Sequence, residues 1–248
     1  MAFWYQRLLK REETSTVVAH MSNRNQRMSV GEDDISTEMS PDVDDNARPR
    51  GGVVDTDGLG DATTVLVLES PAATGRNGVC RSFFVDSRLT EKNVLLVSLV
   101  QQADERLELF RGDDLPFPRN LAVVSAENGA GATRTETGSG EAGTGVAIRT
   151  VSDPSDLPKL GMSITSVLDE WPDDEGVLLC VDSLTELLRH VELKRVYRFV
   201  HVLSDRLADL DAQVHVHLDS ESCDERTLAT LEPLSDAIVE VPAHDNGE

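Results

Sequence analysis

The sequence predicts an α/β fold, a three-layer sandwich in which a mainly parallel β-sheet is covered by helices on both faces. Two observations lead to this prediction. Short apolar runs recur along the chain, and the cleanest is Gly-Val-Leu-Leu-Cys-Val-Asp at residues 176–182. Between these runs, apolar residues recur every three or four positions, as on one face of a helix. Runs that are apolar on both faces are typical of parallel strands, and right-handed crossovers carry helices to the faces of such a sheet.

The same patterns give the order of the elements. We expect strands at residues 63–69, 93–99, 121–125, 147–151, 176–182, 213–218 and 236–241, and helices at 78–88, 103–110, 156–171, 183–190, 193–210 and 225–231. Asp156 or Ser155 is placed to cap the third helix, and Pro172 to end it. Ligands of a parallel sheet bind at the carboxyl ends of its strands. We therefore expect a ligand site near residues 70–77 and Asp182.

Composition divides the chain into one domain and two tails. Residues 1–61 are polar, basic at their start and acidic toward their end, so we expect a disordered tail. The domain spans residues 62–242, with a flexible Gly/Thr-rich loop at 127–145, and residues 243–248 form a second tail. The basic start is either an arm that touches nucleic acid or membrane, or a leader ahead of a true start at Met21 or Met28. We favour a leader or functionless tail, because its few basic residues are spread out.

The charge of the chain is strongly negative, with 45 acidic and 23 basic residues and a formal net charge of −22. Such an excess is typical of proteins from salt-accumulating haloarchaea; an acidic protein from any source is the alternative. The charge argues against a large contact with nucleic-acid phosphates. The 3 cysteines form no CxxC pair, and no apolar run approaches the ~20 residues of a membrane span. We therefore expect a cytoplasmic protein without a disulfide framework or membrane contact.

Two segments resemble one family, the RecA/KaiC-type ATPases. Residues 66–84 resemble the phosphate-binding loop of that family with its flanking strand and helix. Residues 177–188, Val-Leu-Leu-Cys-Val-Asp-Ser-Leu-Thr-Glu-Leu-Leu, resemble its second acidic strand, where Asp-Ser-Leu-Thr is typical of the KaiC branch. The resemblance covers about residues 60–242 and points to the divergent, transducer-like (HTR-like) haloarchaeal members. It implies a RecA-like sheet and a nucleotide site for ATP and Mg²⁺ formed by Gly75, Arg76, Asn77, Gly78 and Asp182.

The loop departs from the family pattern at the residues that hold phosphate. A working loop reads Gly-x-x-x-x-Gly-Lys-Ser/Thr, in which lysine neutralises phosphate and the hydroxyl holds Mg²⁺. Here Ser70 replaces the first glycine and Gly75 keeps the second, while Arg76 replaces the lysine and Asn77 the hydroxyl residue. An arginine fork is not a conservative substitute for an ammonium in a tight loop. We therefore predict a degenerate P-loop and a vestigial nucleotide site.

A further departure concerns the water that attacks ATP. Val100 and Gln101 stand where the KaiC branch has paired glutamates, and neither side chain can act as a general base. We therefore expect a non-catalytic regulatory or signalling protein that acts through a protein partner and needs no cofactor. The alternatives are a nucleotide-binding protein or weak ATPase with an atypical loop, and a nucleic-acid-associated RecA relative. The sequence leaves homo-oligomerisation open.

Histidines raise the question of a metal site. His215 and His217 lie two apart on one predicted strand, so their side chains face the same side. No sequence spacing supplies convergent ligands from other segments. Cysteine inside an apolar strand, as at Cys180, is usually a small hydrophobic residue. We therefore expect no metal ligands among the histidines and cysteines.

Overall fold

The computed structural model describes residues 26–29, 59, 62–70, 76–85, 88–111, 115–126, 138–139, 145–171 and 176–241. The strands are β1 (Gln26–Ser29), β2 (Thr64–Glu69), β3 (Asn93–Ser98), β4 (Asn120–Ala126), β5 (Gly138–Ser139), β6 (Gly145–Val151), β7 (Val177–Asp182), β8 (Ala212–Asp219) and β9 (Ala237–Val241). The α-helices are α2 (Arg76–Val85), α3 (Ala103–Leu107), α4 (Leu157–Leu168), α5 (Leu184–His190), α6 (Leu193–Leu207) and α7 (Glu225–Leu231). Four short 3₁₀ turns, η2 (Leu89–Glu91), η3 (Glu108–Phe110), η4 (Ala208–Leu210) and η5 (Glu232–Leu234), complete the described elements.

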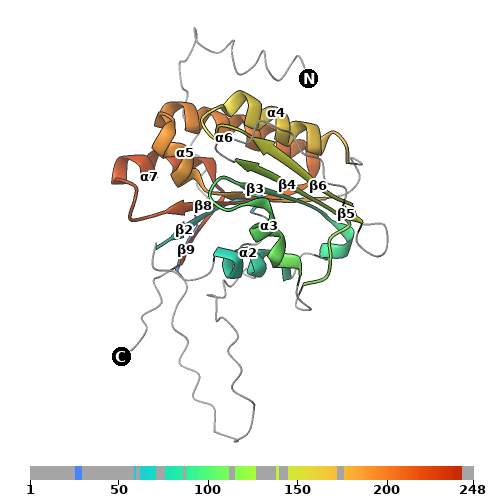
Figure 1. Ribbon diagram of the computed structural model, residues 1–248. Helices are drawn as coiled ribbons and strands as arrows, with labels where there is room; N and C mark the ends of the chain where they lie inside the picture. The colour runs from blue at the N-terminus through green and yellow to red at the C-terminus, as the bar shows by residue number, and fades with distance from the viewer. Residues whose placement is uncertain are drawn as a thin grey trace, which may run out of the picture.

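The strands form one sheet in the order β1-β9-β2-β8-β7-β3-β4-β6-β5. Every pairing is parallel except that of β5 with β6. The connections from β2 through α2 to β3 and through α3 to β4 run toward the β5 edge of the sheet. The connections from β6 through α4 to β7, through α5 and α6 to β8, and through α7 to β9 run toward the β1 edge. Because right-handed crossovers in opposite directions lie on opposite faces, α2 and α3 cover one face and α4 to α7 the other (Figure 1). The predicted α/β class with a mainly parallel sheet is confirmed.

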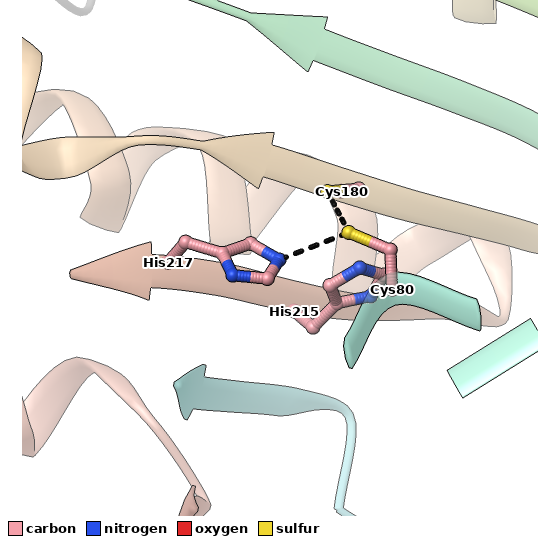
Figure 2. A group of neighbouring side chains, drawn as sticks. All are labelled: Cys80, Cys180, His215 and His217. Atoms are coloured by element: carbon pink, nitrogen blue, oxygen red, sulfur yellow. Dashed lines mark hydrogen bonds between the residues drawn. The ribbon is translucent and has the colours of Figure 1, made fainter. Parts of the chain in front are cut away.

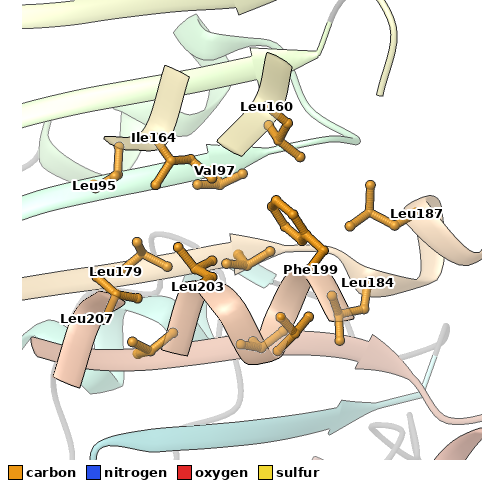
Figure 3. Packing of buried hydrophobic residues seen from close by; sticks show 14 of the residues in the cluster. Leu95, Val97, Leu160, Ile164, Leu179, Leu184, Leu187, Phe199, Leu203 and Leu207 are labelled. Carbon is orange, nitrogen blue, oxygen red and sulfur yellow. The ribbon is translucent and has the colours of Figure 1, made fainter. Parts of the chain in front are cut away.

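Each face of the sheet has its own hydrophobic core. On the face under α4 to α7, leucines of the strands pack against the apolar stripes of the helices; Figure 3 shows Leu95, Val97, Leu160, Ile164, Leu179, Phe199, Leu203 and Leu207 there. On the face under α2 and α3, a second cluster joins Phe84 and Phe110 to alternate residues of β3, β4 and β7. Successive side chains of a strand therefore point to opposite faces of the sheet, and those of Cys180 and Asp182 in β7 point to the α2–α3 face.

Two strands differ from the prediction. β1 lies inside the stretch expected to be disordered, and it pairs with β9 at the edge of the sheet. β5 lies inside the predicted flexible loop and pairs with β6. Their sequences, Gln-Arg-Met-Ser and Gly-Ser, carry no apolar pattern that would identify a strand. Most other residues of 1–61 and 127–145, and all of 243–248, lie outside the described residues.

The predicted helix starts lie within two residues of those found, whereas α2 ends at Val85 instead of Arg88 and α4 at Leu168 instead of Trp171; Pro172, expected to end α4, lies outside the described residues. The Asp156 side chain caps α4 by accepting a hydrogen bond from the backbone N–H of Lys159 at 3.0 Å, which settles the choice between Asp156 and Ser155. The first helix, α2, begins two residues before the predicted position. Among the described helices, none is long and apolar enough to cross a membrane.

Candidate functional site

The carboxyl ends of β2, β7 and β8 bring acidic residues to one edge of the sheet. β8 lies between β2 and β7, so Glu69, Asp182 and Asp219 end neighbouring parallel strands. β2 continues to α2 on one face, whereas β8 continues to α7 on the other. The connections that follow these neighbouring strands go to opposite faces of the sheet, so the ends of β2 and β8 mark a topological switch point, where a crevice is expected.

The predicted nucleotide-site residues are distributed around this edge. Arg76, Asn77 and Gly78 form the start of α2, and Gly75 lies outside the described residues. Asp182 ends β7 as predicted. Ser70, just after β2, donates a hydrogen bond from its hydroxyl to Glu221 Oε1 at 2.6 Å.

Asp182 lies beside a buried cation. Arg106 Nη1 of α3 is 3.8 Å from Asp182 Oδ2, and both side chains have 0% exposure. Burial lowers the pKa of Arg106, but the neighbouring Cys80, Cys180 and Asp182 outweigh it and raise that pKa above its usual value. The guanidinium therefore stays charged and offsets the negative charge of the Asp182 carboxylate.

The same arginine reaches a buried cluster of two cysteines and two histidines. We call Cys80, Cys180, His215 and His217 the Cys/His cluster; all four are buried, and their donor atoms lie within 4.8 Å of one another (Figure 2). α2 supplies Cys80, β7 supplies Cys180, and β8 supplies both histidines. Cys180 and His215 are register partners, which places them side by side on the sheet.

Short contacts hold the cluster together. Cys80 Sγ lies 3.3 Å from Cys180 Sγ and 3.2 Å from His217 Nε2. Arg106 Nη2 donates to Cys180 Sγ at 3.0 Å and to Cys80 Sγ at 3.4 Å. The other ring nitrogen of His217, Nδ1, lies 2.5 Å from Glu69 Oε1, at the end of β2. The cluster joins α2 to β7 and β8, and its contacts with Arg106 and Glu69 extend it to α3 and β2.

Charges around Cys80 set its protonation. Burial raises the pKa of Cys80, but the hydrogen bond with Cys180 and the charges of Arg106 and His217 outweigh it, so this pKa lies well below its ordinary value. Burial raises the pKa of Cys180, and the neighbouring Cys80 raises it further. The arrangement therefore favours a Cys80 thiolate that accepts a hydrogen bond from the Cys180 thiol.

The two histidines of the cluster differ in their surroundings. Burial opposes a charge on His217, but Cys80 and Glu69 outweigh it and raise the pKa of His217 to about 10. His215 stacks on Phe83 with ring centroids 4.5 Å apart and meets Phe84 edge-on at 5.4 Å. Burial lowers the pKa of His215, and its Nε2 is buried with no hydrogen-bond partner. His215 is therefore a neutral imidazole with one ring nitrogen unsatisfied.

The sequence did not reveal this cluster. We expected no metal ligands among the histidines and cysteines, yet the structure brings four of them together. The only signal was the spacing of His215 and His217, because α2 and β7 supply the cysteines from positions 137 and 37 residues before His217. Nor did the sequence identify Arg106 as buried, since arginine on a helix is normally exposed.

Comparisons with known proteins place the chain in a family. A comparison with solved structures matches a protein from Pyrococcus horikoshii OT3, described only as the subject of a structural study, with 18% identity and a TM-score of 0.45 over 75% of this chain and 83% of that one. Comparison with curated proteins gives no match. The model of DUF7504, a family of unknown function, matches residues 62–241. The chain therefore belongs to the DUF7504 family.

Proposed function

We propose that this chain is a non-catalytic RecA/KaiC-like protein that acts in regulation or signalling by binding a protein partner in the cytoplasm. One observation carries the proposal. Asp182, the acidic residue that the family resemblance places in the nucleotide site for ATP and Mg²⁺, has its Oδ2 3.8 Å from Nη1 of the buried Arg106. An internal cation therefore stands beside the carboxylate that a catalytic metal would need.

The described residues do not fit an ATP–Mg²⁺ site. Mg²⁺ binds through one or two carboxylates and keeps several waters, so it needs space beside its ligands. Asp182 and Arg106 both have 0% exposure, and an incoming hydrated ion would have to displace the guanidinium. Glu69, at the end of β2, is held by His217. We therefore propose no hydrolytic step.

The positions expected to activate water support the same conclusion. Val100 is 52% exposed and has no ionisable group. Gln101 Oε1 lies 3.5 Å from Arg106 Nη1, and an amide cannot take a proton from water. Because a domain without turnover acts through contacts or a retained ligand, we assign its role to a protein partner.

The cytoplasmic assignment rests on the cysteines. Cys80, Cys180 and Cys223 are all free of disulfide bonds, which is typical of a reducing compartment.

The second candidate function is nucleotide binding without hydrolysis, because α2 begins at Arg76 and the start of a helix favours a phosphate. Gly75, Arg76, Asn77 and Gly78 would hold the nucleotide in that case.

Calorimetry at molar salt separates the two functions. We expect no heat of ATP–Mg²⁺ binding that depends on Arg76 or Asp182. Saturable binding by the wild type that Arg76→Ala abolishes would favour the nucleotide-binding function instead. Arg81→Ala, which removes a charge from the same helix, is the matched control for a general loss of positive charge.

A second experiment addresses the partner. The tagged full chain is purified at molar salt from its native cells, and each associated protein is then expressed and bound again from purified components. We expect at least one protein to bind again in a fixed ratio, with and without ATP–Mg²⁺. Failure of every purified component to bind would contradict the proposal.

A further inference from the structure

We propose that Cys80, Cys180, His215 and His217 bind a single Zn²⁺ ion between α2 and the sheet. The donors are two sulfurs and two imidazole nitrogens, all on buried residues and all within 4.8 Å of one another. Tetrahedral sites with this donor set are typical of zinc, whereas Mg²⁺ and Ca²⁺ prefer oxygen ligands. This inference goes beyond the proposed function and does not depend on it.

The geometry is close to that of a tetrahedral site. Zn–S bonds of ~2.3 Å and Zn–N bonds of ~2.0 Å place tetrahedral ligands roughly 3.3–3.8 Å apart. Cys80 Sγ lies 3.3 Å from Cys180 Sγ and 3.2 Å from His217 Nε2, and the remaining donor pairs are no more than 4.8 Å apart. Small side-chain rotations would therefore be enough to bring all four donors to one ion.

The residues around the donors match the outer shell of a metal site. Metal-binding histidines usually donate their other ring N–H to a carboxylate, which orients the ring. His217 has this arrangement, since Nδ1 faces Glu69 Oε1 at 2.5 Å while Nε2 faces Cys80. Arg106 donates to both sulfurs, which stabilises thiolates. Two thiolates and two neutral imidazoles would balance the charge of Zn²⁺.

His215 supplies an independent observation. Its Nε2 is buried and has no hydrogen-bond partner, although buried polar atoms are normally paired. Phe83 and Phe84 lie against the ring, and its polar neighbours are Cys80 and His217, two other members of the Cys/His cluster. A metal bond would satisfy this ring nitrogen, and the neutral form of the ring is the one that binds metals.

A structural ion fits the burial of the cluster better than chemistry at Cys80 does. His217 contacts Cys80 through one ring nitrogen and Glu69 through the other, as in sites where a base activates a nucleophile and a carboxylate orients the base. However, the Cys80 side chain has 0% exposure, so a substrate cannot reach its sulfur. Structural zinc sites are closed by four protein ligands, and their ions contribute to folding. The ion would join α2 to β7 and β8 and so fix the helix that follows residues 70–75.

The test measures zinc in the full chain at molar salt, with excess Mg²⁺ present to occupy surface carboxylates. We expect one Zn²⁺ per chain in the wild type and in two control variants, Cys223→Ser and His201→Gln, which lie outside the cluster. Cys80→Ser, Cys180→Ser and His217→Gln should each weaken Zn²⁺ binding by about 100-fold or more. Glu69→Gln should weaken it by ~10–100-fold, as expected for a residue that orients a ligand.

Three further measurements on the wild type keep the proposal testable if a cluster variant fails to fold. The wild-type chain stripped of metal should gain melting temperature when Zn²⁺ is added, and Co²⁺ should give it a sulfur-to-metal absorption band. Absence of both signals would overturn the proposal, as would zinc binding that survives Cys80→Ser. Thiol titration of the denatured, unreduced chain should find all three cysteines free. A single free thiol would instead indicate a Cys80–Cys180 disulfide and would also overturn the proposal.

Discussion

Replacing Arg106 with methionine should destabilise the fold strongly. The change keeps most of the side-chain volume but removes the cation beside Asp182 Oδ2 and the donor to the sulfurs of Cys80 and Cys180. Removing one partner of a buried ion pair typically costs about 3–5 kcal/mol, because the other charge is left uncompensated. For a domain of this size, each kcal/mol lowers the melting temperature by roughly 2–4 °C, so we expect a loss of about 6–20 °C.

A double-mutant cycle tests the cause of that loss. Asp182→Asn removes one of the negative charges that Arg106→Met leaves behind, so the double variant should lose less stability than the two single losses added together. The expected interaction free energy is about 1–3 kcal/mol, measured by urea unfolding at molar salt. Arg111→Met is the control, because Arg111 forms an exposed pair with Glu108 and should cost less than ~1 kcal/mol. If Arg106→Met costs no more than Arg111→Met, the buried ion pair does not have the role assigned to it.

Three further predictions concern packing, a helix cap and salt. Leu160→Ala should cost about 2–5 kcal/mol in urea unfolding because Leu160 is fully buried, while Met162→Ala on the exposed side of α4 should cost little; equal losses would contradict the packing. Hydrogen bonds with Thr227 hold the pKa of Asp224 below its ordinary value, so its stabilisation of α7 is present at neutral pH and is lost as the pH falls through the folded-state pKa. The melting-temperature gap between the wild type and Asp224→Ala should therefore persist at about pH 5 and shrink below about pH 4, and a gap that stays constant to about pH 3 would contradict this cap. With a net charge of −22, the chain should melt at a lower temperature in dilute buffer than in molar salt, and an unchanged midpoint would refute the expected self-repulsion.

The sequence was a good guide to the central strands and helices because their patterns are strong. β7 is apolar along its whole length before Asp182, and α4 repeats apolar residues at helical spacing from Leu157 to Leu168. β1 has no such pattern, and it owes its place to β9, which offers backbone groups at the edge of the sheet. Pairing between segments about 200 residues apart leaves no local signal.

The candidate site was partly predictable. Asp182 could be placed at a strand end from the sequence, because a buried strand and a following helix fix its position. Its partner Arg106 could not, since burial of an arginine depends on what the neighbouring elements offer. The Cys/His cluster was hidden for a similar reason: Cys80 lies 100 residues from Cys180 and 137 from His217, and only the sheet order brings them together.

The most direct test of the account is the rate of phosphate release from ATP–Mg²⁺ by the full chain at molar salt. We expect the wild type and Asp182→Asn to release phosphate at the same background rate, because the proposal assigns no metal to Asp182, whose Oδ2 lies 3.8 Å from Arg106 Nη1. Turnover by the wild type that Asp182→Asn abolishes, while Asp219→Asn leaves it intact, would contradict the account.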